Sequence, residues 1–350
     1  MADALLSPAA GAAMCALSAA ANAYAVKKIK KDDLCEKKIP VMGVMGAFVF
    51  AAQMINFTIP ATGSSGHIGG GILLAAMIGG FPALLSISAV LIIQCLFFAD
   101  GGLFALGCNI FNMGVIPCLI VYPLLFKPLV KKGLTWGRIT AASIAAVVIS
   151  LQLGAFGVVL ETQLSGITKL PFLTFLLLMQ PIHLAIGIVE GAITAAVLCF
   201  VYKMRPEIME STYNGTAIQN GIPMKKALIT LAAVTLVTGG ILALFASSYP
   251  DGLEWSMEKT AGTAELEVKS PILEGAASIQ EATAFLPDYD FKSEEAAGDA
   301  GSAGDAGSAG VGTSVAGIVG SLFSFLLAGI AAFVISAVKK RRKENTAVCA

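Results

Sequence analysis

The sequence has little charge and almost no histidine. Charged residues fill 13% of its 350 positions and only two residues are histidine, whereas soluble domains carry roughly 25% charged residues. Hydrophobic residues make up 56% of the chain, which indicates an integral membrane protein. Lys plus Arg and Asp plus Glu number 23 each, so no excess of basic charge points to a nucleic-acid partner.

Signatures of catalysis are missing as well. The sequence contains no Walker A loop, no nucleophile elbow and no paired-carboxylate site in a soluble domain. Its seven cysteines include no Cys-x-x-Cys pair and lie mostly in apolar runs, which favours packing residues over a disulfide or metal framework. No basic residue precedes the first apolar run, so no cleavable signal peptide is indicated. We therefore expect no enzyme and no resident cofactor.

Nine apolar runs are candidates for membrane-embedded helices. A hydrocarbon core about 30 Å thick requires roughly 20 helical residues for each crossing. The runs lie near residues 7–26, 41–59, 67–80, 83–98, 103–126, 139–159, 172–202, 226–247 and 313–338. The run at 67–80 is too short to cross alone, so we expect a tilted half-span or re-entrant helix among its neighbours. The predicted fold class is an all-α integral membrane protein.

The basic residues predict how the chain is oriented. Lys and Arg accumulate on cytoplasmic loops. They follow the first, fifth, seventh and ninth runs, at Lys27, Lys28, Lys30, Lys31, Lys37 and Lys38, at Lys127, Lys131, Lys132 and Arg138, at Lys203 and Arg205, and at 339–343. All of these lie inside if the amino terminus is outside and the carboxyl terminus inside. The same parity places His67, Asp100 and residues 248–312 on the outer face.

The runs divide into two predicted domains. Residues 1–205 form a seven-span membrane domain, 206–224 a polar cytoplasmic linker, and 225–343 a two-span module. The external loop of this module, about 248–312, carries thirteen acidic residues against three lysines. Its low-complexity Gly-Ala-Ser-Asp repeat at 298–310 is too poor in apolar side chains to form a core, so we expect a flexible tether there.

His67 is the strongest candidate for a functional residue. It lies among glycines between two apolar runs, in the segment Gly63-Ser-Ser-Gly-His-Ile-Gly-Gly-Gly71. A neutral imidazole is a frequent ligand of transition-metal ions, and the glycines allow a close approach of the backbone. The plainer alternative is a loop or capping histidine at the membrane interface.

His183, the second histidine, lies inside the 172–202 run. It follows Pro181 by two residues and precedes Glu190 by seven on the same helix face. Ionisable residues within a membrane commonly mark functional sites. Metal contact, support of a metal ligand and ordinary interhelical hydrogen bonding are all compatible with this position.

Four motifs resemble one family, the substrate-binding membrane components NikM and CbiM of nickel and cobalt energy-coupling factor (ECF) transporters. They span about 200 residues in the family's order. The motifs are Ala-Leu-Leu-Ser-Pro at 4–8, Asn56-x3-Pro-x2-Gly-x-Ser65-Gly-His67-x2-Gly70, Ala-Asp-Gly-Gly at 99–102 with Gly107-Cys-Asn109-x2-Asn112-Met-Gly114, and Pro181-Ile-His183-x6-Glu190-Gly191. Residues 226–258 end in Pro-Asp-Gly-Leu-Glu-Trp at 250–255 and resemble the accessory subunit NikN or CbiN, here fused to the same chain.

The resemblance implies a planar nitrogen site for the transported ion. It assigns as ligands the free amino terminus of Met1, the backbone amide of residue 2, the imidazole of residue 2, and His67. Here residue 2 is Ala2, so that imidazole is absent. We hypothesise that translation begins at a Met-His two residues upstream; otherwise Asp3 completes the site or binding is weak. Square-planar nitrogen ligation suits Ni(II), and an amino terminus with a pKa near 7.7–8.0 loses its proton readily to a metal.

Further positions are expected to support the site or to contact partners. Asn56, Ser65, Asn109 and Asn112, like His183 and Glu190, could orient His67 or line its pocket, and interhelical hydrogen bonding explains them equally well. In the resembled family, small residues of the first helix dock a transmembrane coupling subunit. The corresponding residues here are Ala9, Ala12, Ala16 and Ala20.

The sequence thus predicts uptake of Ni(II) or Co(II) across a bacterial or archaeal cytoplasmic membrane, with a coupling subunit and ATPase subunits as partners besides membrane lipid. Nickel and cobalt lie too close in affinity order for the sequence to choose between them. Two alternatives stay open. One is a vitamin-binding ECF component, which would need a roomier, aromatic-lined pocket; the other is an intramembrane zinc hydrolase using His183 and Glu190, which lacks the HExxH spacing.

Overall fold

The structure is a computed structural model of the whole chain, and it describes residues 1–29, 38–216, 225–264, 266, 270–291 and 306–348. Several predictions concern positions outside these ranges. They are the lysines at 30, 31 and 37, the cysteines at 35 and 349, part of the 206–224 linker and residues 298–305 of the predicted tether.

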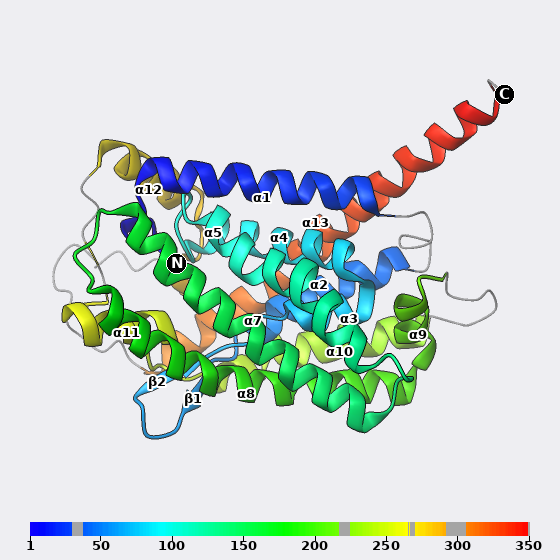
Figure 1. Cartoon of the computed structure of the whole chain (residues 1–350), viewed down its shortest axis with the longest axis horizontal. Coiled ribbons are helices and arrows are strands. Elements are labelled where there is room, and N and C mark those ends of the chain that lie inside the picture. Colours follow the sequence, from blue (N-terminus) through cyan, green and yellow to red (C-terminus); the bar gives the residue numbers. More distant parts are fainter. Residues whose placement is uncertain (30–37, 217–224, 265, 267–269, 292–305, 349–350) are drawn as a thin grey trace.

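The described chain is a bundle of helices with one small hairpin (Figure 1). Its amino-terminal part comprises η1 (Asp3–Leu5), α1 (Pro8–Lys28), α2 (Lys38–Gln53), β1 (Phe57–Ile59), β2 (Ser64–Gly66), α3 (Gly71–Ile78), α4 (Gly80–Phe98), α5 (Leu106–Ile110), η3 (Phe111–Phe126), α6 (Lys127–Leu129), α7 (Trp136–Ser165), α8 (Phe172–Met204) and α9 (Pro206–Asn214). Its carboxyl-terminal part comprises α10 (Lys225–Gly240), η4 (Leu242–Phe245), α11 (Gly252–Ala261), α12 (Pro271–Thr283), η5 (Pro287–Tyr289) and α13 (Ala306–Val348).

Seven helices of the described residues are long and apolar enough to cross a membrane. This confirms the predicted all-α membrane class and seven of the nine apolar runs. The other two runs are shorter than predicted. The run at 41–59 forms the sixteen-residue α2, and then the chain turns into the hairpin; the run at 67–80 forms the eight-residue α3, which is buried throughout.

Local sequence explains where the helices begin and bend. The Ser7 hydroxyl accepts a hydrogen bond from the Ala10 amide at 3.3 Å, and Pro8 occupies the first turn of α1, both favourable at a helix amino terminus. η3 is a π-type helix that contains Pro117 and Pro123. Proline cannot donate the normal intrahelical hydrogen bond, and the wider turns accommodate both rings without ending the helix.

The carboxyl-terminal helices pack closely against the amino-terminal part. α13 and α10 lie along α2, which is almost completely buried. Small residues make this approach possible: a Cβ atom on Gly320 would overlap the Phe50 ring, and one on Gly239 would lie 3.0 Å from the Gly317 carbonyl oxygen. Close backbone contact at small residues is the usual way helices associate in membranes.

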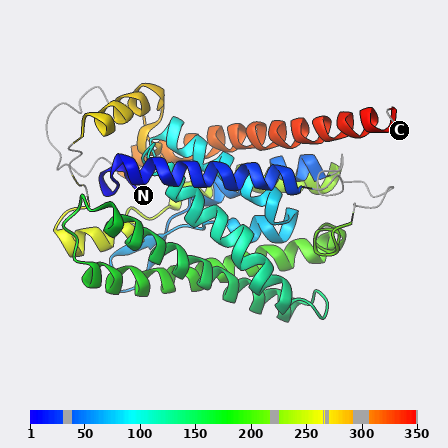
Figure 2. The ribbon, with the colours of Figure 1, turned by 45° about the horizontal axis from the view of Figure 1, so that its top comes forward.

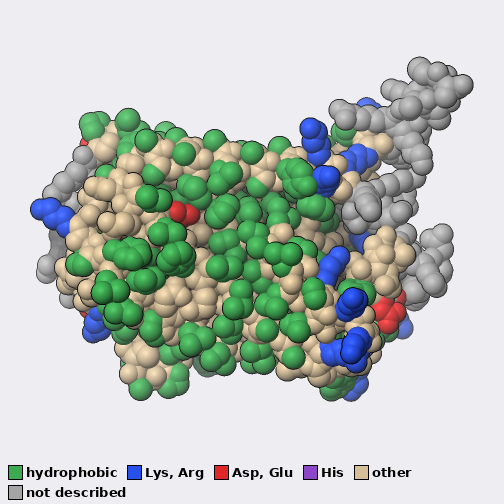
Figure 3. Space-filling model, viewed as in Figure 1, with side chains coloured by type: hydrophobic (Ala, Val, Ile, Leu, Met, Phe, Trp, Pro, Cys, Tyr) green, Lys and Arg blue, Asp and Glu red, His purple; other side chains and the backbone are tan. Residues whose placement is uncertain are grey.

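The molecule has two different ends (Figures 1 and 2). The amino terminus, α11 and α12 lie at one end, which we call the site end, and α9 and the carboxyl terminus lie at the other, the basic end. Most Lys and Arg side chains visible in Figure 3 gather at the basic end, while the band between the ends is largely hydrophobic. This arrangement is that of a bilayer-spanning protein.

The segment between α10 and α13, which we call the outer segment after its predicted side of the membrane, contains more helix among its described residues than the sequence indicated. The sequence predicted no helix in the acidic loop at about 248–312, but its described residues include helices α11 and α12 and the turn η5, all packed at the site end. Their buried side chains include Met257, Leu273 and Leu286. The many acidic residues of the segment lower its hydropathy, so amphipathic helices of this kind do not stand out in the sequence.

Candidate metal site

His67 is placed by a glycine-rich turn. β1 and β2 pair antiparallel, with Phe57 opposite Gly66, and His67 follows β2 directly. The chain then reverses at Gly70, whose φ of 78° is left-handed and where a Cβ atom would lie 2.5 Å from a Val49 methyl carbon. Only glycine fits this conformation without strain. The turn delivers the imidazole next to the amino terminus of α3.

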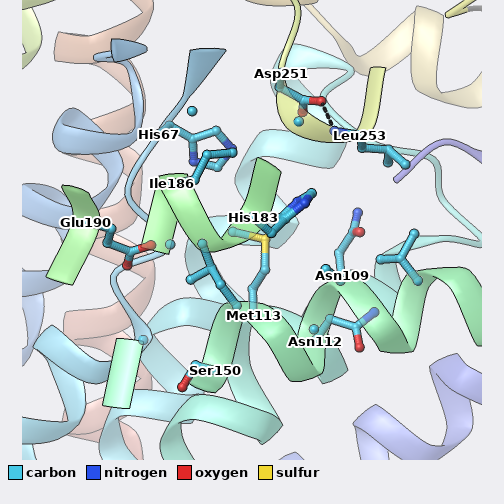
Figure 4. Close-up of a pocket in the computed structure, with 18 of the residues that line it drawn as sticks. His67, Asn109, Asn112, Met113, Ser150, His183, Ile186, Glu190, Asp251 and Leu253 are labelled. Carbon is cyan, nitrogen blue, oxygen red and sulfur yellow. Dashed lines mark hydrogen bonds between the residues drawn. The ribbon is translucent and has the colours of Figure 1, made fainter. Parts of the chain in front are cut away.

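A cavity of about 190 Å³ opens beside this turn (Figure 4). Both histidines of the chain line it, as do Met1, Asn109 and Asn112. Met113 and Met179 add thioether groups to the wall, and Asp251 contributes a carboxylate. These nitrogen, sulfur and oxygen donors come from five separated segments of the chain.

The hydrogen bonds of the two imidazoles favour one ring nitrogen for ligand contact. His67 Nδ1 lies 3.2 Å from the Ile68 carbonyl oxygen, and His183 Nδ1 lies 2.8 Å from the Met179 carbonyl oxygen. When Nδ1 donates its proton to a carbonyl, Nε2 carries the free lone pair. Each ring is thus oriented in the manner typical of metal-binding histidines.

Glu190 supports the His67 turn from behind. Its Oε1 accepts a hydrogen bond from the Gly70 amide at 3.0 Å, at the amino terminus of α3, and the side chain is only 2% exposed. A carboxylate at this position complements the unsatisfied amides of the helix. Its other oxygen, Oε2, has no hydrogen-bond partner among the described residues, and Glu190 also lines the cavity.

The amino terminus is anchored at the edge of the cavity. The Met1 carbonyl accepts hydrogen bonds from the Gly102 amide at 3.2 Å and from Asn109 Nδ2 at 3.5 Å. The Asp3 carboxylate accepts one from the Ala105 amide at 2.8 Å. Burial raises the pKa of Asp3, and its backbone hydrogen bonds oppose part of that rise. Ala2 is exposed and is not among the residues that line the cavity.

The Pro-Asp-Gly-Leu-Glu segment forms part of the cavity wall. Asp251 accepts hydrogen bonds from the Leu253 and Glu254 amides at 2.8 Å each, which begins α11 with a capping box. Gly252 lies against His183, where a Cβ atom would be 3.0 Å from the ring Cε1. Sequence reasoning found the motif but not its place in the site, because that contact joins residues far apart in the chain.

The same segment is tied to the His67 hairpin. Ser65 donates from its amide to the Pro250 carbonyl at 2.8 Å and from its hydroxyl to the Tyr249 carbonyl at 2.7 Å. The Trp255 indole donates to the Thr62 carbonyl at 2.9 Å. The two halves of the chain therefore meet immediately beside the cavity.

The other predicted residues lie in different places. Asn112 lines the cavity and donates to Glu161 Oε2 at 2.9 Å, whereas Asn56 contacts the second half through its carbonyl, which accepts from the Ser247 amide at 2.8 Å. The predicted docking residues all lie exposed on α1; they are Ala9, Ala12, Ala16 and Ala20.

Carboxylate and cysteine side chains do not by themselves form a metal site in the described part of the chain. Among the residues that the structure describes, no three His, Cys, Asp or Glu side chains cluster closely enough to hold a metal ion. The five described cysteines are free thiols. An ion in this cavity would therefore use backbone, amino-terminal or thioether groups besides imidazole.

The fold and the cavity define a polytopic membrane protein with a small, donor-rich site at one end. Two family models match it: the CbiM model, a cobalt uptake substrate-specific transmembrane region, over residues 1–208, and the PDGLE domain over residues 225–337. The chain belongs to the CbiM family and carries a PDGLE domain behind it.

Relatives and solved structures agree with this assignment. The chain is 31% identical over 312 residues to a protein of Archaeoglobus fulgidus named as a fused nickel transport protein, NikMN, covering 89% of this chain and 90% of the relative. It is 27% identical over 262 residues to the cobalt transport protein CbiM of Geobacter sulfurreducens, covering 71% of this chain and 72% of that relative. A crystal structure of a transition metal transporter is similar with a TM-score of 0.51 at 28% identity, covering 60% of this chain and 97% of that one.

Proposed function

We propose that this protein binds Ni(II) or Co(II) in the cavity at its site end, as the substrate-specific component of an ECF-type transporter. The ion enters from outside the cell and is released inside. ATP hydrolysis takes place in separate ATPase subunits, and a transmembrane coupling subunit transmits it to this chain. The docking alanines of α1 are the proposed contact with that coupling subunit.

The observation that carries the proposal is the meeting of Met1, His67 and His183 around one cavity. His67 supplies an imidazole nitrogen and the amino terminus of Met1 supplies another, with Asn109 holding Met1. His183 and Glu190 act as supporting groups. Nitrogen donors in a planar set suit Ni(II), whereas oxygen cages suit harder ions.

The size of the cavity favours an ion over a vitamin. Pockets for organic ligands occupy roughly 300–1,000 Å³. The cavity here is about 190 Å³. It also differs from a zinc hydrolase site, because histidine and carboxylate ligands do not cluster within the described residues.

The test is isothermal titration with Ni(II) and Co(II) on detergent-purified full-length chain. We expect the His67→Ala variant to lose at least about 100-fold in affinity, because losing a ligand costs more than the 10–100-fold typical of outer partners. The chain is made with and without an added Met-His start, and metal content is measured in parallel. Equal nickel binding by all three forms would exclude both His67 and the amino terminus as ligands.

A further inference from the structure

One segment of the carboxyl-terminal half lies across the end of α4. We call it the outer strap and define it as residues 271–289, which comprise α12 and η5. It does not line the cavity. Its contacts nevertheless reach both segments to which we assign metal ligands.

Gln280 attaches the strap to the turn after α4. α4 ends irregularly, because the Ala99 and Asp100 amides both turn back to the Gln94 carbonyl. Gln280 Nε2 donates to the Cys95 carbonyl at 2.8 Å and to the Gly101 carbonyl at 2.6 Å. Carbonyls at a helix end otherwise need such partners from elsewhere. Gln280 is buried, although α12 as a whole lies at the surface.

A single peptide group links the strap to the amino terminus. The Gly101 carbonyl accepts from Gln280, and the amide of the same peptide, on Gly102, donates to the Met1 carbonyl at 3.2 Å. A peptide group is planar and rigid. Fixing its oxygen therefore also fixes the direction of the amide that holds Met1.

Tyr289 links the strap to the His67 turn. Its ring stacks on Phe98 with centroids 5.2 Å apart, and its hydroxyl donates to Asp100 Oδ2. The backbone amide of Asp100 in turn donates to the Gln94 carbonyl at 3.1 Å. Gln94 Nε2 donates to Gln53 Oε1 at 3.0 Å, and Gln53 Nε2 donates to the Gly69 carbonyl at 3.1 Å. Both glutamines are buried. Gly69 is two residues from His67.

We propose that Gln280 and Tyr289 are positioning residues for the metal site, which hold Met1 and the His67 turn in the arrangement that binds the ion. This inference rests on the proposed function. The carboxyl-terminal half would then contribute to metal binding by positioning the ligands, even where it supplies no ligand itself. Buried polar networks of this kind rigidify the groups at their ends.

The experiment compares Gln280→Ala and Tyr289→Phe with two matched controls in the full-length chain. Ser278→Ala alters an exposed residue of α12 whose hydroxyl donates to the Gly275 carbonyl at 2.9 Å. Tyr24→Phe removes a phenol hydroxyl from an exposed side chain of α1 that does not line the cavity. Ni(II) and Zn(II) affinities are measured by titration, and the thermal midpoint of the metal-free protein is recorded for each form.

We expect the two strap variants to bind Ni(II) about 10–100-fold more weakly, as outer partners of metal ligands do, and to lose preference for Ni(II) over Zn(II) because the planar arrangement loosens. The controls should match the unaltered chain. Tyr289→Phe keeps the ring on Phe98, so it carries the test if Gln280→Ala does not fold. If the unaltered chain binds metal and the strap variants bind it as tightly as the controls do, this inference alone is overturned. If the unaltered chain binds neither Ni(II) nor Co(II), the proposed function is overturned.

Discussion

At the scale of single residues, the site depends on groups that orient ligands as much as on the ligands. His67 and His183 each direct Nδ1 to a backbone carbonyl, and Glu190 holds the backbone just after His67. Such outer partners fix the tautomer and the direction of a metal-binding ring. Their removal should weaken binding without abolishing the fold.

Glu190 offers a direct test of this view. We expect Glu190→Ala to lower Ni(II) affinity by about 10–100-fold, because the Gly70 amide loses its buried acceptor and the His67 turn loosens. Glu190→Gln keeps an acceptor oxygen and should retain most of the affinity. Titration of both purified variants gives the comparison. Equal losses in the two variants would show that the charge, and not the hydrogen bond, is what matters.

Residue by residue, the sequence predicted the site unevenly. The sequence singled out His67 by its glycine-rich setting, His183 and Glu190 as ionisable residues in an apolar run, and Asn109 and Asn112 by the family motifs. All five line the cavity. Gln53, Gln94 and Gln280 were not found. A glutamine in an apolar run shows no periodicity that reveals its partner, and these partners come from segments up to 185 residues away.

At the scale of elements, hydrophobic runs predicted the long helices well and the short ones less well. α4, α7 and α8 begin and end within about six residues of the predicted runs. The hairpin and α3 are determined by tertiary packing around His67, which no local pattern reports. The helices of the outer segment were missed because their apolar residues are sparse among acidic ones.

The packing of α13 on α2 yields a prediction at this scale. Gly320 lies against the Phe50 ring, so Gly320→Leu should destabilise the protein by about 1–3 kcal/mol or more, as overpacking does. Gly329→Leu is the matched control, since Gly329 lies on the same helix and a Cβ atom there meets nothing within 4 Å. Thermal midpoints in detergent compare the two variants. A control as unstable as Gly320→Leu would refute the packing explanation.

At the scale of the whole molecule, charge is distributed along the long axis. Most of the Lys and Arg side chains in view gather at the basic end (Figure 3), while the outer segment near the site is acidic in sequence. The positive-inside rule then predicts that the basic end faces the cytoplasm.

This orientation can be measured with reporter fusions. Green fluorescent protein fused after Ala350 should fluoresce, and alkaline phosphatase at the same position should be inactive, because both then lie in the cytoplasm. Phosphatase fused after Gly262, in the outer segment, should be active. The reverse pattern would invert the proposed direction of metal entry.

The hydrogen bonds from Ser65 to Tyr249 and Pro250 mean that one wall of the cavity comes from the second half of the chain. When two such parts are separate proteins, completing the wall requires a bimolecular encounter and depends on how much of each is made. A covalent connection replaces that encounter with an intramolecular one at an effective concentration of the order of millimolar. Every copy of this polypeptide thus brings both parts in a fixed one-to-one stoichiometry.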